Sequence, residues 1–465
     1  MIDDVFLVEH FANRLQRSGR EAFVFDQEGK LFVVEVVDLE LGVVRVTLRD
    51  GEVPGGARCD VQAKAQKRCC RFLGLGAAVD EFPAVACRVL DDELAGRLVD
   101  IANGVFVRIT FFVSKDHHPL GNAQMAHGLF AVLLSDLHVH GGGGSDWMSG
   151  EGGIRTFIRY HSSQGTTAIA PTSATGPVTA IEDALAAITR IASNRGPGEA
   201  VVVGAHLEGP FLNPKRPGAM DVRLILEGDA ELAARWARQH RIAVATVAPE
   251  IPGGRGVIEA LSKAGCRVQI GHSVATPEEV GRAFEWGCCG FTHLFNAMTG
   301  LEHRAPGIAT YALAKGEYAE MICDMIHVDP LVVLAARRAI PRLYAITDAS
   351  AAGLPDGEFE WGGRRVIKKG GRITLMNGST LAGSAITMLD AFRNLVQLGL
   401  GLEEVVEMTS TRQADYLGRR DLGRIEPGAR AGLVRLGKTL ELEGVWIEGE
   451  SVAISASQPE PAPAS

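Results

Sequence analysis

The sequence predicts an α/β protein built on a TIM-like (β/α)8 barrel, with a small accessory β-domain and an atypical N-terminal region. From about residue 109 onward, short β-branched apolar runs alternate with helix-compatible segments, which is the pattern of parallel β/α units. Eight such runs lie within about 220 residues, close to the typical size of a (β/α)8 barrel. In addition, acidic and imidazole side chains follow the ends of these runs, where barrel active sites are built.

Each predicted strand is a short apolar run that ends near a polar or glycine residue. The eight strands are expected at residues 130–138, 166–170, 201–206, 242–247, 267–270, 290–293, 320–324 and 343–347. Helices are expected between them, for example at residues 177–193, 230–240, 277–286 and 330–339. Several of these helices begin with proline, which is tolerated in the first helical turn.

Four regions follow from these patterns. Residues 1–128 form an N-terminal β-rich region, in which residues 21–48 predict β-hairpins, residues 91–102 a helix and residues 105–113 a strand. Residues 129–370 form the barrel, and residues 371–455 the last barrel helices and C-terminal β-strands. In that last region, strands are expected at residues 372–375, 433–436 and 440–447, with a helix at residues 385–398. The Pro-rich and Ala-rich tail, residues 456–465, is predicted to be disordered.

Composition favours a small-molecule partner. The formal net charge is −9, and Lys and Arg form no long block, which argues against nucleic acid and anionic membranes as partners. The acidic N-terminal residues do not resemble a secretory signal, and the apolar run at residues 129–134 is far shorter than a membrane helix. We therefore expect a cytoplasmic protein. Its eight cysteines lack C-x-x-C spacing and are interpreted as thiols.

Six side chains stand out because each lies at or just beyond the end of a predicted strand: His138, His140, Glu208, His272, His293 and Asp348. Any one of them alone is more simply a core histidine, a helix cap or a solvated loop residue. The C-terminal ends of all barrel strands meet at one face, so six together predict a single site. Imidazole and carboxylate are ligands for a divalent metal, and the pattern therefore indicates a hydrolytic metal site.

The spacing suggests a role for each residue. In an extended strand, His138 and His140 point the same way and can chelate one ion. A bound metal lowers the pKa of water towards about 7, and Asp348 is then placed to move a proton to a leaving nitrogen. His327, after the seventh strand, either polarises a carbonyl oxygen or is a hydrogen-bonded structural histidine.

With these residues in view, the chain resembles the N-acetylglucosamine-6-phosphate deacetylases of the amidohydrolase superfamily. The matching stretches include HLEGPFLNPKRPGA, GHSVAT, THLFNAMTGLEHRAPG, DMIHVDP, ITDASAAGLPDGEF and TLAGSAITMLDAFRNLVQLGL. They extend over residues 135–450 and are jointly specific. The resemblance implies release of acetate from an N-acetylated amino-sugar phosphate.

The resemblance also implies the roles of individual residues. Glu208, His272 and His293 match the main metal ligands, and Asp348 matches the acid/base. The substrate-binding positions would be Ala219, Met220, Asn296, Ala297, Arg304, Asp324, His327, Leu381, Ala382 and Gly383, with Arg304 serving the phosphate. Family members hold one or two ions per subunit, and retention of His138 and His140 favours two. Zinc is expected first, with iron, manganese or cobalt as alternatives, and a homodimer is implied.

Three departures from the family pattern concern substrate preference and fold. Met220 stands where many members have a substrate-contacting histidine. Gly432 and the residues after it replace an acidic strand-like motif, and the N-terminal 125 residues are about twice the usual length.

Three alternatives stay open. The substrate could be the galactosamine epimer, or the chain could be a silent barrel with a binding role, although none of the predicted ligands is lost. A cyclic amidase is disfavoured, because the fourth strand, ending ATVAPE, offers no lysine to bridge two metals.

Overall fold

A computed structural model describes residues 21–25, 31–38, 43–48, 107–108, 129–426 and 428–454. Most of the helix and strand predicted between residues 91 and 113, and the tail at residues 456–465, lie outside these ranges. The chain divides into two compact units, the first comprising residues 1–110, 114–131 and 425–428, and the second the remainder.

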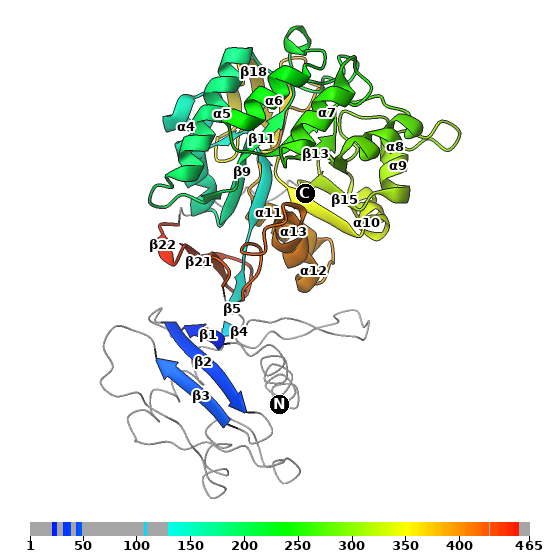
Figure 1. The fold of residues 1–465 in the computed structure, drawn as a ribbon. Helices are drawn as coiled ribbons and strands as arrows, with labels where there is room; N and C mark the ends of the chain where they lie inside the picture. The colour runs from blue at the N-terminus through cyan, green and yellow to red at the C-terminus, as the bar shows by residue number, and fades with distance from the viewer. Residues whose placement is uncertain are drawn as a thin grey trace, which may run out of the picture. The chain divides into compact units, whose positions relative to one another are not determined.

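The first unit contains a three-stranded antiparallel sheet (Figure 1). Its strands are β1 (Glu21–Phe25), β2 (Leu31–Asp38) and β3 (Val43–Leu48), joined in sequence order. Phe23 lies opposite Val33, and Val34 opposite Val46. The hairpins predicted for this segment are therefore confirmed. A short strand, β4 (Val107–Arg108), pairs in parallel with β5 (Leu129–Val132).

The second unit is built on eight parallel strands: β6 (Ser135–Val139), β9 (Ala168–Ser173), β11 (Ala205–Glu208), β12 (Ile242–Val247), β13 (Arg267–Ile270), β14 (Cys288–Phe291), β15 (Tyr318–Ile322) and β16 (Arg342–Ile346). Consecutive strands pair in parallel from β6 to β14, and β15 pairs with β16. Between β14 and β15, the Leu294 amide donates to the Glu320 carbonyl at 2.8 Å. The Asp348 amide donates to the His138 carbonyl at 2.8 Å, which joins β16 to β6. The ring closes, and the predicted (β/α)8 barrel is confirmed.

Two of the predicted strands are interrupted. The first is divided into β5 and β6 at residues 133–134, and the third into β10 (Val201–Val202) and β11. At the second break, Gly204 has φ +143°, and a Cβ atom there would lie 2.9 Å from the Ala243 Cβ. Only glycine fits this close approach to the next segment, so the backbone bends before it brings Glu208 to the strand end.

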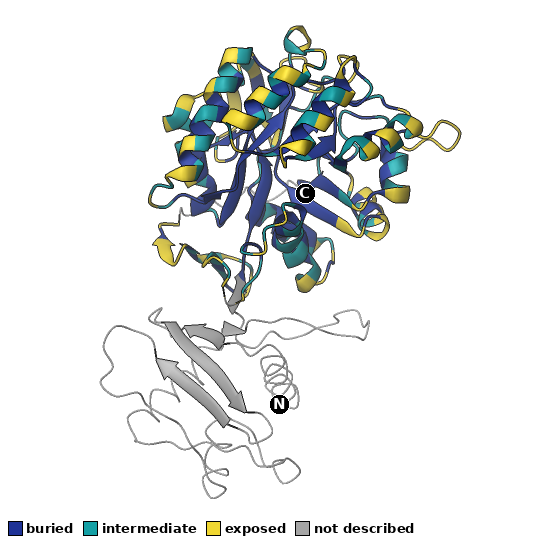
Figure 2. Ribbon diagram, viewed as in Figure 1, coloured by how far each residue is buried: buried dark blue, intermediate teal, exposed yellow. Residues whose placement is uncertain are grey.

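Helices cover the outside of the barrel and present mixed faces, with buried residues toward the strands and exposed residues toward solvent (Figure 2). They are α4 (Gly150–Ser163), α5 (Val178–Ser193), α6 (Ala230–Gln239), α7 (Gly254–Lys263), α8 (Pro277–Trp286), α9 (Ile308–Lys315), α10 (Pro330–Ala339), α11 (Met388–Gln397), α12 (Leu402–Val406) and α13 (Arg412–Tyr416). Thr276 and Glu279 form a capping box at α8, with Pro277 in the first turn, as the sequence indicates. Among the described residues, no helix has the length and apolar character required to cross a membrane.

A three-stranded antiparallel sheet lies between β16 and α11 in the sequence. It comprises β17 (Gly357–Trp361), β18 (Arg364–Lys369) and β19 (Arg372–Leu375). The bounds of β19 and of β20 (Leu433–Leu436) agree with prediction, and β21 (Leu442–Ile447) and β22 (Glu450–Val452) complete the C-terminal hairpins. Strands β17 and β18 were not predicted, because β17 has only a short alternating stretch and β18 is mainly charged, without alternation.

Candidate metal centre

The six candidate ligands gather at one end of the barrel, because each follows or ends a parallel strand. His138 lies in β6 and His140 directly after it, while Glu208 is the last residue of β11. His272, His293 and Asp348 each lie two residues beyond a strand. Their donor atoms fall into two groups, His138, His140 and Asp348 in one and Glu208, His272 and His293 in the other. Within each group, the donor atoms lie within 4.8 Å of one another.

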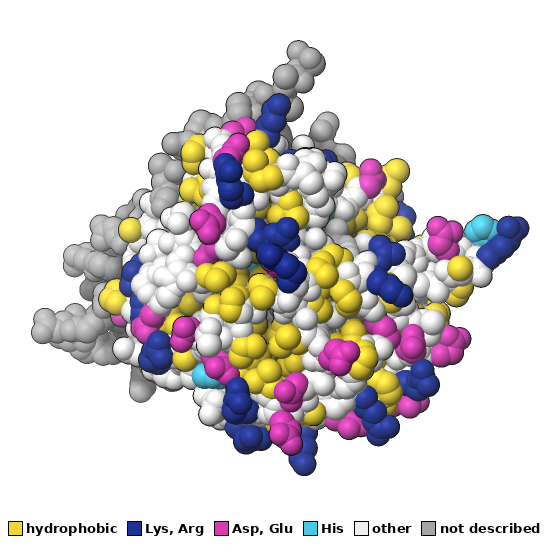
Figure 3. Space-filling view, turned by 90° about the horizontal axis from the view of Figure 1, so that it is seen from above, with side chains coloured by type: hydrophobic (Ala, Val, Ile, Leu, Met, Phe, Trp, Pro, Cys, Tyr) yellow, Lys and Arg dark blue, Asp and Glu magenta, His cyan; other side chains and the backbone are white. Residues whose placement is uncertain are grey.

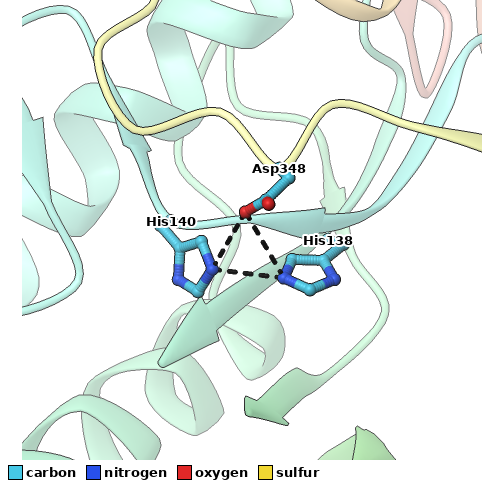
Figure 4. A group of neighbouring side chains, drawn as sticks. All are labelled: His138, His140 and Asp348. Atoms are coloured by element: carbon cyan, nitrogen blue, oxygen red, sulfur yellow. Dashed lines mark hydrogen bonds and ion pairs between the residues drawn. The ribbon is translucent and has the colours of Figure 1, made fainter. Parts of the chain in front are cut away.

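In the first group, the carboxylate of Asp348 faces the two imidazoles of the H-x-H pair (Figure 4). The Nε2 atoms of His138 and His140 are 3.1 Å apart. Asp348 Oδ1 lies 3.2 Å from the His140 Nε2 and 3.6 Å from the His138 Nε2. The side chain of Asp348 is 13% exposed, whereas both imidazoles are buried. This carboxylate is therefore within reach of a ligand from outside.

The second group surrounds one carboxylate oxygen. Glu208 Oε1 lies 3.1 Å from the His272 Nε2 and 2.9 Å from the His293 Nε2. The same glutamate approaches the first group, with Oε2 3.2 Å from the His140 Nε2 and Oε1 3.6 Å from the His138 Nε2. Glu208 thus lies between the two groups, as a carboxylate shared by two ions would.

Hydrogen bonds at the far ring nitrogens determine which nitrogen of each histidine can bind a metal. His138 Nδ1 is 2.6 Å from Glu320 Oε1, His140 Nδ1 is 3.1 Å from the Thr172 carbonyl, and His272 Nδ1 is 2.9 Å from the Arg216 carbonyl. A carbonyl oxygen or an ionised carboxylate can only accept, so in each case Nδ1–H donates. In the neutral ring, the lone pair is therefore on Nε2, which points to the shared centre.

His206 completes a neighbouring cluster with His138 and Glu320, but its hydrogen bonds occupy both ring nitrogens. Its Nδ1 contacts the Leu137 carbonyl at 2.9 Å, and its Nε2 contacts the Thr246 hydroxyl at 2.8 Å. Burial, followed by repulsion from His138, lowers the pKa of His206 to about 3. We therefore interpret His206 as a neutral structural residue beside the centre.

The centre concentrates buried negative charge. Burial alone would raise the pKa of Glu208, but attraction to His138 and hydrogen bonds from the surrounding histidines lower it well below its usual range. For Asp348, burial is likewise outweighed by His138 and His140, and its pKa falls to about 2. Glu320, also buried, has a lowered pKa, because the attraction of His138 exceeds the effect of burial. Three buried carboxylates require compensating positive charge nearby.

The backbone is strained where three of the ligands leave their strands. His272, His293 and Asp348 have φ values of +47°, +26° and +50°, in a region that residues other than glycine rarely adopt. Such conformations cost on the order of 1–3 kcal/mol each and cluster at functional sites. Here, they accompany the convergence of side chains from three separate loops.

The partners that orient these candidate ligands were not predicted from the sequence. Glu320 lies within the apolar strand YAEMI and is fully buried. A carboxylate in the middle of such a strand is itself a signal, since an unpaired buried charge is costly. The carbonyls of Thr172 and Arg216 could not be recognised, because backbone groups carry no residue-specific pattern.

Most predicted substrate-binding residues border the same end of the barrel. Ala219 and Met220 are buried, and a Cβ atom on Gly218, next to them, would lie 3.1 Å from the His272 Cε1 and 3.7 Å from the Ala297 Cβ. A Cβ atom on Gly383, in the segment Leu381, Ala382 and Gly383, would lie 2.7 Å from the Asp348 carbonyl. These two segments therefore adjoin the candidate ligands.

The remaining predicted residues differ in how closely they are held. His327 Nδ1 lies 2.7 Å from Asp324 Oδ2, so the aspartate orients the ring. Asn296 is half-buried, and its amide donates to the His293 carbonyl at 3.2 Å. Arg304 lies in the exposed segment 301–306 and forms no hydrogen bond or ion pair with the described part of the chain.

A (β/α)8 barrel that gathers imidazole and carboxylate donors at the C-terminal ends of its strands has the arrangement of a metal-dependent amidohydrolase. No protein-family model matches the chain. Among curated proteins, it is 36% identical over 375 residues to an N-acetylgalactosamine-6-phosphate deacetylase of Escherichia coli O157:H7, covering 78% of this chain and 97% of the relative. It is 33% identical over 368 residues to an N-acetylglucosamine-6-phosphate deacetylase of Vibrio furnissii, covering 77% of this chain and 90% of the relative.

Solved structures agree with these relatives. The N-acetylglucosamine-6-phosphate deacetylase of Thermotoga maritima is 30% identical, with a TM-score of 0.64, over 70% of this chain and 89% of that protein. A variant of the Mycobacterium smegmatis enzyme, solved with N-acetyl-D-glucosamine-6-phosphate, is 28% identical, with a TM-score of 0.66, over 70% of this chain and 87% of that one. The chain belongs to the N-acetylglucosamine-6-phosphate deacetylase family of the amidohydrolase superfamily.

Proposed function

We propose that the protein hydrolyses the acetamide of N-acetylglucosamine 6-phosphate, releasing acetate and glucosamine 6-phosphate. The observation that carries this proposal is the convergence of Glu208, His272 and His293 on one point, with Asp348 beside it. The names of the relatives supply the substrate class. A phosphorylated sugar is retained inside cells by its charge, which supports a cytoplasmic location.

The donor set fits a divalent ion. When the rings are neutral, the lone pairs of three ring nitrogens face a buried carboxylate, and that arrangement needs a cation in the centre, either a metal ion or ring protons. We infer that Glu208, His272 and His293 hold one ion and that His138 and His140 add capacity for a second, with Glu208 shared. Zinc is our first choice, and iron, manganese and cobalt suit the same donors. The bound ion would polarise the acetamide carbonyl and promote the ionisation of water.

Asp348 is the proposed acid/base. Its carboxylate is ionised and slightly exposed, so it can accept the proton of the attacking water. As the carbon–nitrogen bond breaks, it returns that proton to the nitrogen, so that acetate and the free amine leave. His327 is proposed to contact the carbonyl oxygen. Asp324 orients its ring through the contact with Nδ1 at 2.7 Å.

The remaining predicted residues are proposed to bind the sugar and its phosphate. Ala219, Met220, Asn296, Ala297 and the segment of residues 381–383 adjoin the metal centre and would contact the sugar. We propose that Arg304 binds phosphate and that the protein is a homodimer. The exposure of segment 301–306 supports this arrangement, because a residue without partners in the described part of its own chain is available to a second subunit.

The galactosamine epimer is a second candidate substrate. The relative at 36% identity carries that name, and Met220 replaces the histidine that many family members use to contact the sugar. Initial rates on the two N-acetylated hexosamine 6-phosphates, measured with zinc, iron, manganese and cobalt in turn, would identify the preferred epimer and metal.

Metal content and acetate release test the proposal together. The purified protein is expected to contain one or two divalent ions per chain and to release acetate from N-acetylglucosamine 6-phosphate. The corresponding galactosamine substrate serves as the parallel assay. A protein that binds metal but releases acetate from neither sugar phosphate would support the silent barrel instead.

A further inference from the structure

The hairpin of β17 and β18 brings an arginine to the turn that carries Met220. Arg364, the first residue of β18, donates from Nη1 to two consecutive carbonyls, those of Ala219 at 2.7 Å and Met220 at 2.8 Å. The nitrogen Nη1 carries two protons, and these two bonds use both of them. Arg364 is half-buried, and its contacts cross about 145 residues of sequence.

The other edge of this guanidinium has no partner among the described residues. Neither Nε–H nor Nη2–H of Arg364 donates a hydrogen bond there, and no carboxylate forms an ion pair with it within the same part of the chain. The neighbouring acid, Asp221, is engaged on both oxygens by Arg223, at 3.0 and 2.6 Å. Arg365, the next residue, is paired with Glu358. The Nε and Nη2 edge of Arg364 is thus a preformed fork for a carboxylate or phosphate.

This arginine lines a cavity of about 460 Å³, together with Asp221, Arg223, Arg365 and Asn377. Such a volume is within the range of sites that accept small ligands. Lys and Arg side chains lie near the middle of the molecular face seen from above in Figure 3. Among the described residues, no carboxylate forms an ion pair with Arg364, and the nearby Asp221, which attracts it electrostatically, is engaged by Arg223, so a bound anion would further compensate the charge of Arg364.

The turn that Arg364 holds also approaches the candidate metal centre. Gly218, which precedes Ala219, approaches both the metal-binding candidate His272 and the substrate-binding candidate Ala297. A ligand that contacts Ala219 and Met220 on one side can therefore extend an anionic group toward Arg364 on the other.

We propose that Arg364 binds the phosphate group of the substrate through its Nε and Nη2 edge, so that the cavity beside β18 is a phosphate subsite within the chain itself. The nature of the anion rests on the proposed function. A phosphate monoester carries roughly 1.5 to 2 negative charges and three terminal oxygens, so it can accept from both Nε and Nη2 of Arg364.

Steady-state kinetics on phosphorylated and unphosphorylated N-acetylglucosamine tests this assignment. Arg364→Gln removes the charge, and we expect kcat/KM for the phosphorylated sugar to fall at least tenfold further than kcat/KM for the unphosphorylated one. Arg364→Lys should recover part of the loss, because it keeps the charge but lacks the fork. Arg255→Gln, the matched control, removes an exposed arginine of α7 that is paired with Glu259 and lies outside the cavity, and it should change both values less than about twofold. Equal losses on both sugars in Arg364→Gln would mean that Arg364 only positions the turn, and would overturn the proposal.

A binding measurement separates this inference from the proposed function. Inorganic phosphate and glucosamine 6-phosphate, titrated calorimetrically into the metal-loaded protein, should bind the unaltered chain and bind Arg364→Gln at least tenfold more weakly. If the unaltered protein binds phosphate through Arg364 but hydrolyses neither sugar, the anion subsite stands and the deacetylase proposal fails. If Arg364→Gln binds both probes as tightly as the unaltered protein, the subsite is refuted whatever the activity.

Discussion

Replacement of Glu320 by glutamine should weaken metal binding without unfolding the barrel. Glu320 Oε1 accepts from His138 Nδ1 at 2.6 Å and from the His293 amide at 3.1 Å. Glutamine has the same shape, and its single oxygen can occupy the Oε1 position and keep both bonds. Its amide nitrogen then faces the Tyr344 hydroxyl, which lies 3.4 Å from Oε2 and can rotate to accept. The change removes the charge and leaves the geometry.

The charge matters because a carboxylate at Nδ1 makes the His138 ring more basic, so that the lone pair on Nε2 binds a metal ion more strongly. Loss of such an orienting carboxylate typically costs about 10- to 100-fold in metal affinity, or about 1.4 to 2.7 kcal/mol. We expect this loss at the ion held by His138 and His140, with a smaller effect at the ion held by Glu208, His272 and His293. The affinities for the two ions should therefore change by different factors in Glu320→Gln.

Competition between the metal-free protein and a zinc chelator of known affinity would measure these constants, with circular dichroism as the check on folding. Glu199→Gln is the matched control, because Glu199 is equally buried but pairs with Arg155 and Arg159. It should lower the free energy of unfolding and leave zinc affinity unchanged. Zinc constants within about twofold of the unaltered protein for Glu320→Gln would refute the reasoning that its charge tunes the centre.

Three further changes test separate parts of the site. Asp348→Asn should abolish acetate release while metal content stays as before, because asparagine tolerates the positive φ but cannot accept the proton; near-normal turnover would remove Asp348 as the acid/base. Arg304→Ala should raise KM for the phosphorylated sugar much more than for the unphosphorylated one, and equal effects on both would make Arg304 structural. Burial lowers the pKa of His161 to about 4, so the unfolded chain takes up its proton first and the folded state loses stability as pH falls from about 6.5 to about 4. Between about pH 7 and about pH 5, the free energy of unfolding of His161→Asn, measured with urea, should therefore fall by about 2 kcal/mol less than that of the unaltered protein. Equal decreases in the two proteins would contradict this assignment.

Local patterns account for what sequence reasoning could predict. The strands β12 and β13 were predicted at their observed bounds, because both are apolar runs flanked by clear breaks. Helices α8 and α10 were also predicted at their observed bounds, since proline and a capping side chain mark their starts. The ligand candidates were found because barrel topology requires that residues after parallel strands share one face, which is a property of chain order.

Strand β18 was missed for the opposite reason. Its charged residues form a strand through pairing with β17 and β19, and that stabilisation is not encoded in alternation. The contact between Arg364 and the turn at Ala219 could not be predicted either, because the two segments lie about 145 residues apart in the sequence.

The sequence by itself determined the barrel, the six candidate ligands and the family to which the chain belongs, because each depends on short segments read in order. Only the tertiary structure decided which ring nitrogen of His138 faces the centre, since that depends on Glu320, 182 residues away. It also decided that Glu208 lies between two groups of donors. Distances of a few ångströms between remote side chains arise when the ring of strands closes, and no local pattern contains them.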